Sequence, residues 1–77
     1  MSPEKREKLK IMIEAIKEAI VREEESALFY LNKSKAEHFE ELNSLFKSLA
    51  NLELEHKKDL ERLLIEYESQ LNSHEKE

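Results

Sequence analysis

The sequence predicts an all-α protein made of two long helices, and three observations support this prediction. The 77-residue chain has no Gly and one Pro, so little in it breaks a helix. Ala, Glu, Lys, Leu and Arg make up well over half of the residues, which is typical of long amphipathic helices. Apolar residues recur at alternating spacings of three and four, the period of one helix face. We therefore expect an antiparallel two-helix hairpin that forms a single domain over residues 1–77.

The first helix is expected over about residues 3–35. Ser2 is a suitable cap and Pro3 a suitable first helical residue, and an acidic residue follows in the first turn. The apolar stripe of this helix is interrupted by one carboxylate, that of Glu23. Glu24 is expected to point to solvent, because successive helical residues are about 100° apart. The stripe consists of Leu9, Ile13, Ile16, Ile20, Glu23, Ala27 and Tyr30.

The break between the helices is not marked by Gly or Pro, and we place it at about residues 36–39. Ser34 followed by Glu37 could instead be a capping box that starts the second helix, although the spacing of the stripe also accepts a later turn. The second helix is then expected over about residues 40–73. The last residues of the chain are expected to fray.

The second helix carries a carboxylate and an imidazole in the middle of its apolar stripe. The stripe consists of Phe39, Leu42, Phe46, Leu49, Glu53, His56, Leu60, Leu63 and Tyr67. With a break centred near residue 38, Glu23 and Glu53 lie equally far from it, roughly 22 Å along their helices. The three polar groups are therefore expected in one layer. Buried carboxylates need a counter-charge, hydrogen bonds or a metal ion.

Two copies of the chain would complete a metal site. Two helices bury only one stripe against another, so we expect self-association into a four-helix bundle. The bundle would hold two copies each of Glu23, Glu53 and His56. Carboxylate-bridged di-iron bundles use this set, with Glu from two helices and Glu-x-x-His from the other two. Oxygen ligands with one imidazole per metal suit iron or manganese, and zinc can also enter.

Two segments also carry a family resemblance. They resemble the helix motifs of the rubrerythrin branch of the ferritin-like superfamily, in which a Glu is followed by a Tyr seven residues later and by a Glu-x-x-His about thirty residues later. The resemblance covers nearly the whole chain. Having one helix pair and no cysteine-ligated rubredoxin domain, the chain is similar to the half-length encapsulated ferritins. The segments are Arg22-Glu23-Glu24-Glu25-Ser26-Ala27-Leu28-Phe29-Tyr30 and Leu49-Ala50-Asn51-Leu52-Glu53-Leu54-Glu55-His56.

The resemblance implies a ferroxidase that works as a homodimer or as a larger assembly of dimers. Each ferritin-like dimer would bind two Fe, which Mn or Zn can replace, and would oxidise Fe(II) with oxygen or peroxide. Tyr30 would donate a hydrogen bond to a ligating carboxylate; the alternative is an ordinary core aromatic. Without a rubredoxin domain, no electron donor is built in. Residues 70–77 lack the glycine-containing signal that directs encapsulated ferritins to their shell, so encapsulation stays open.

Composition argues against several other classes. The net charge is −5 and no Lys/Arg face stands out, which argues against nucleic-acid binding. No apolar run approaches the roughly 20 residues of a membrane span and no signal peptide is evident, so we expect no membrane partner and a cytoplasmic location, or one inside a protein compartment. The absence of cysteine excludes disulfides and zinc–thiolate sites.

The main alternative is a metal-free dimerisation or scaffold module. In that case the Glu/His layer would only set the register in which helices pair. A fragment of a longer chain is a third alternative, which the start and end signals of both helices disfavour. His38 and His74 lack a Glu three residues earlier and are expected to be solvated.

Overall fold

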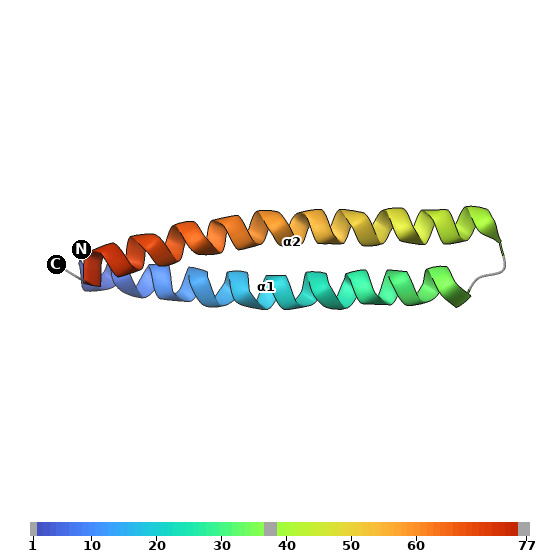
Figure 1. The fold of residues 1–77 in the computed structure, drawn as a ribbon. Helices are drawn as coiled ribbons and strands as arrows, with labels where there is room; N and C mark the ends of the chain where they lie inside the picture. Colours follow the sequence, from blue (N-terminus) through green and yellow to red (C-terminus); the bar gives the residue numbers. More distant parts are fainter. Residues whose placement is uncertain (1, 37–38, 76–77) are drawn as a thin grey trace.

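The computed structural model describes residues 2–36 and 39–75, which form two helices (Figure 1). Helix α1 spans Pro3–Ala36 and helix α2 spans Glu40–Glu75. The all-α prediction is confirmed, since the described residues contain no strand. Compared with the expected ranges 3–35 and 40–73, α1 ends one residue later and α2 two residues later. The centre of the expected break, residues 37 and 38, lies outside the described part of the chain.

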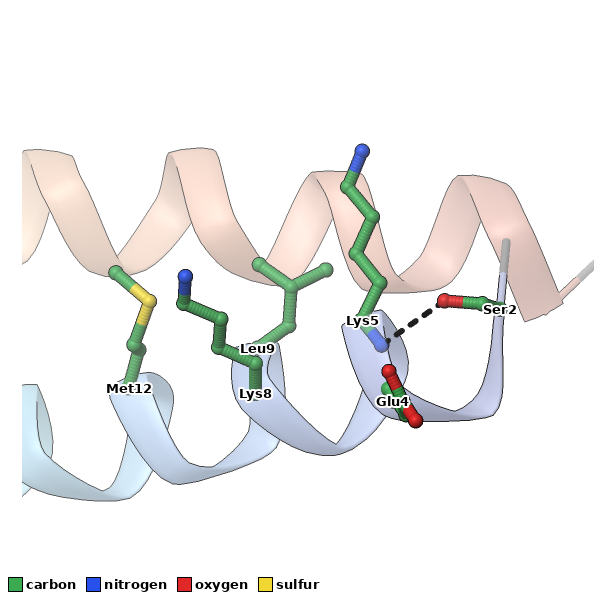
Figure 2. A pocket seen from close by; sticks show the side chains of 6 residues that line it. All are labelled: Ser2, Glu4, Lys5, Lys8, Leu9 and Met12. Atoms are coloured by element: carbon green, nitrogen blue, oxygen red, sulfur yellow. Dashed lines mark hydrogen bonds between the residues drawn. The ribbon is translucent and has the colours of Figure 1, made fainter.

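Side-chain hydrogen bonds show how α1 begins and place Ser34 within it. Ser2 Oγ accepts a hydrogen bond from the backbone N–H of Lys5 at 3.2 Å, as expected of a helix cap (Figure 2). Ser34 is buried, and its Oγ donates to the carbonyl of Leu31 at 2.7 Å within α1. Ser34 therefore belongs to the last turns of α1, and the alternative that it caps the second helix is wrong.

The start of α1 also lines a surface pocket, seen in Figure 2, which contains none of the predicted ligands. Met12, its lining residue nearest to Glu23 in sequence, is eleven residues away, or roughly 16 Å along the helix. The lining residues are Ser2, Glu4, Lys5, Lys8, Leu9 and Met12.

The two helices lie side by side, and the start of α1 and the end of α2 are at the same end of the pair (Figure 1). Near the connection, the ring of Tyr30 stacks on that of Phe46. Farther along, Glu23 meets His56. Toward the free ends, Ile13 and Leu71 line a common pocket. The pair forms a rod with extents of 58 × 14 × 12 Å.

The predicted stripe of α1 faces α2 along its whole length. Leu9, Ile13 and Ala27 are buried, and the other stripe positions, Ile16, Ile20, Glu23 and Tyr30, are half-buried. Glu24 is exposed, as expected from its rotation off the stripe. The three-and-four spacing therefore identified the inner face of this helix.

On α2 the predicted stripe is wrong along one edge. Ala50 is fully buried, and Asn43, Lys57 and Leu64 are half-buried, although none belongs to the predicted stripe. The stripe positions one residue before them include three exposed ones, namely Leu42, His56 and Leu63. Phe39, at the start of the stripe, is exposed as well. One neighbouring helix covers only one side of a broad stripe, and α1 covers the Ala50 side.

The uncovered side of α2 forms an apolar surface that we call the His56 face. Its residues follow one another at spacings of three, four and seven, so they share one side of the helix. Four of its leucines are 36–50% exposed. The face consists of Leu42, Leu45, Leu49, Leu52, His56 and Leu63.

Within the described residues, neither helix has the length and apolar character that crossing a membrane requires.

Candidate metal centre

Glu23, Glu53 and His56 meet where α1 and α2 touch. Each offers one ligand atom, and these atoms all lie within 4.8 Å of one another. Glu53 and His56 are three residues apart on α2, so their side chains leave the same side of the helix, whereas Glu23 reaches them from α1. The three side chains thus share one layer, as expected from their equal distances to the break. We call this group the Glu/His cluster.

The side chain of Glu23 is more enclosed than that of His56. Its side chain is 23% exposed, against 57% for His56. Glu23 Oε2 is buried and has no hydrogen-bond partner among the described residues. His56 Nδ1 lies 3.6 Å from that oxygen. Leaving a buried acceptor unpaired costs roughly 1–3 kcal/mol, and more for a charged group. The oxygen is therefore placed to receive a cation.

The two carboxyl groups of the cluster disturb each other. The neighbouring Glu23 carboxyl, which the protonated form of Glu53 can hydrogen-bond, raises the pKa of Glu53 above its ordinary value. Desolvation and the negative charge of Glu23 raise it further, and His56 opposes them. A positive charge added to the layer would lower the cost of keeping both carboxylates ionised.

An ion pair lies beside the cluster, formed by the residues that follow Glu23 and His56 in sequence. Lys57 Nζ lies 3.3 Å from Glu24 Oε1 and 3.9 Å from Glu61 Oε1. Glu24, which follows Glu23 in sequence, is therefore engaged by Lys57 and is not part of the cluster. Lys57 is not among the residues predicted from the sequence, because it lies within a run of charged residues that is typical of a solvated helix face. Its spacing of four from Glu53 was the available signal.

Tyr30 makes the contacts of a core aromatic. Its ring stacks on Phe46 with centroids 6.3 Å apart and meets the edge of Phe29 at 5.5 Å. It is seven residues from Glu23 on the same helix face, or roughly 10 Å along the axis. Among the described residues it has no hydrogen bond to a cluster carboxylate, so that role stays a prediction. His38 lies outside the described residues, as does the side chain of His74.

The donor set of the Glu/His cluster suits a divalent transition metal. Two carboxylates and one imidazole favour iron or manganese and accept zinc. The unpaired Glu23 oxygen and the raised pKa of Glu53 are both features that a bound cation would relieve. A metal ion bound by three ligands from one chain would have further coordination positions, which ligands from another molecule could fill. The exposed side of His56 opens onto the His56 face, where a second chain could supply them.

Comparisons of the chain with protein-family models, with curated proteins and with solved structures found no match. The sequence motifs and the geometry of the Glu/His cluster therefore carry the functional argument.

Proposed function

We propose that the chain is a di-iron carboxylate protein that binds two Fe per homodimer and oxidises Fe(II) with oxygen or peroxide. One observation carries this proposal. A carboxylate from α1 and a carboxylate and an imidazole from α2 place ligand atoms within 4.8 Å of one another, and one carboxylate oxygen is buried without a hydrogen bond from any described residue. Two such sets make up the ligand inventory of a di-iron bundle.

The proposed dimer joins two antiparallel hairpins through their His56 faces. This face holds several large leucines that the single chain leaves partly exposed, beside the one cluster residue that is mainly exposed. Fully burying a leucine side chain contributes roughly 1.5–3 kcal/mol. Covering the face would therefore favour association and would bring the two Glu/His clusters together in a ferritin-like four-helix bundle.

The residues of the chain have separate tasks in the proposed reaction. Glu23 and Glu53 from both copies supply four negative charges, which balance two divalent cations, and His56 supplies one nitrogen to each metal. Fe(II) is the substrate, and each of two ions gives up one electron. Peroxide takes up both electrons and leaves as two hydroxide ions, or as water once protons are added. Carboxylates favour the product because they bind Fe(III) more strongly than Fe(II) on charge grounds.

Metal analysis and oxidation assays test the proposal directly. Protein purified without chelator should contain about two metals per dimer, and Fe(II) added in air should be oxidised faster than without protein, as followed by near-ultraviolet absorbance. His56→Ala should lose both properties while keeping its helicity. Glu55→Ala is the matched control, because Glu55 is an exposed acidic residue on the same helix. Full metal content in His56→Ala would show that the ligand assignment is wrong.

The metal-free scaffold is a second candidate, and one contact favours it. If His56 is protonated, its 3.6 Å approach to Glu23 is an ion pair that satisfies part of the layer without metal. The layer would then set only the register of pairing. Less than about one metal per dimer, together with oxidation no faster than the protein-free control, would favour this candidate.

A further inference from the structure

The Glu24–Lys57 ion pair is formed by two residues that each follow a residue of the Glu/His cluster in sequence. Glu24 follows Glu23 on α1, and Lys57 follows His56 on α2. Lys57 is half-buried between the helices, with its Nζ 3.3 Å from Glu24 Oε1. Because neighbouring helical residues differ by about 100°, the ion pair occupies one side of the helix contact and His56 the other. The layer thus has a fixed cation on one side and an open imidazole on the other.

Glu24 would be a competent metal ligand if it were released. Its Cα is one residue from that of Glu23, about 3.8 Å away, and its side chain is 51% exposed, so neighbouring residues leave space around it. A third carboxylate would add oxygen ligands to a set that has two carboxylates and one imidazole. Hard cations such as Ca²⁺ bind six to eight oxygen ligands, whereas iron, manganese and zinc accept a set that includes an imidazole.

We infer that Lys57 determines metal specificity by holding Glu24 away from the Glu/His cluster. The ion pair engages the Glu24 carboxylate, and the ligand atoms that lie within 4.8 Å of one another belong to Glu23, Glu53 and His56 and not to Glu24. Lys57 is a positioning residue, since it acts through Glu24. This inference rests on the proposed function, because it concerns the selectivity of the same site.

Calcium titration of the apo protein, followed by calorimetry, tests the inference. Lys57→Gln should bind Ca²⁺ about ten-fold more tightly than the wild type, through one additional charged ligand. Lys57→Arg keeps the cation and should bind like the wild type. Lys58→Gln removes an exposed neighbouring lysine and controls for the loss of one positive charge. Circular dichroism shows whether each variant is folded.

Two double variants of equal net charge separate ligation from simple electrostatics. Lys57→Gln with Glu24→Gln should return to wild-type Ca²⁺ affinity, because the released ligand is gone. Lys57→Gln with Glu61→Gln should stay about ten-fold tighter, because Glu24 is still present, although Glu61 is also near Lys57. Equal affinities in the two double variants would overturn the inference, as would unchanged affinity in Lys57→Gln.

The single variant Glu24→Gln gives a test that leaves Lys57 in place. With the lysine present, Glu24 does not ligate, so the Co(II) absorption spectrum and the Mn²⁺ affinity should match the wild type. Weaker Mn²⁺ binding in this variant would overturn the inference. If the wild type binds neither Mn²⁺ nor Fe²⁺, the proposed function itself fails, and this outcome is distinct from those that concern Lys57 alone.

Discussion

The two sides of the helix pair differ in a way that explains how the candidate centre is built. On one side, Lys57 bridges to Glu24 and closes the contact between the helices with fixed charges. On the other side, His56 stands mainly exposed among partly exposed leucines. The first side carries an ion pair between the helices, whereas the second side has apolar surface and an imidazole that the single chain leaves partly exposed. Under the proposed function, the second side would contact the other copy of the chain.

The largest expected effect comes from placing charge on the second side. Replacing both Leu49 and Leu52 by Asp should weaken the proposed dimer by more than about a hundred-fold, because each buried carboxylate without a partner costs several kcal/mol. Analytical ultracentrifugation measures this change. The matched control, Leu54→Asp with Ile65→Asp, alters two exposed apolar residues outside the His56 face and should leave the dimer intact. Equal losses in both pairs would show that the His56 face is not the interface.

The second-largest expected effect is the stabilisation of the folded protein by metal bound at the Glu/His cluster. A ligand present at a thousand times its dissociation constant adds about 4 kcal/mol to the free energy of unfolding. Mn²⁺ should therefore raise the melting temperature of the wild type, and chelation should reverse the rise. His56→Ala should show no metal-dependent rise, while Lys58→Gln should behave like the wild type. Thermal unfolding followed by circular dichroism gives the measurement.

Acidity should affect the metal-free protein through Glu53. The folded state raises the pKa of Glu53 above its ordinary value of 4.5, so the folded state binds this proton more tightly than the unfolded chain. The stability that this tighter proton binding contributes is fully present below the pKa of Glu53 in the unfolded chain, and it is lost as pH rises through the pKa of Glu53 in the folded state. Glu53→Gln should remove this dependence and make the apo protein more stable than the wild type at neutral pH. Urea unfolding of both proteins between pH 4 and pH 7, with chelator present, measures the difference. A wild type that gains stability relative to Glu53→Gln over this rise in pH would contradict the assignment.

The smallest expected effect lies far from both sides, at the start of α1. Ser2→Ala removes the acceptor of the Lys5 N–H and should cost about 1 kcal/mol of stability. Ser2→Asp restores an acceptor and should recover it. Metal affinity should be unchanged in both variants, because the cap and the Glu/His cluster are separated by most of α1. A change in metal affinity in either variant would mean that the cap and the Glu/His cluster are coupled.

Sequence periodicity predicted the two helices, the inner face of α1 and the common layer of Glu23, Glu53 and His56. These features depend on helix geometry alone, which fixes spacing and rotation. The period could not show which edge of the α2 stripe α1 would cover, because Leu49 and Ala50 are both apolar and either could face inward. The fully buried position is Ala50, whose small side chain lets the helices approach closely. Lys57 was missed because a charged residue at a contact edge has the same sequence pattern as one in solvent.

The slender shape of the helix pair has a consequence for redox chemistry. The helix pair is 14 × 12 Å across, so an ion held by Glu23 and the mainly exposed His56 would lie close to the surface of a single chain. Such an ion would be accessible to bulk solvent from the His56 side. Groups that shield this ion from water would have to come from outside the single chain. The proposed reaction would therefore depend on assembly.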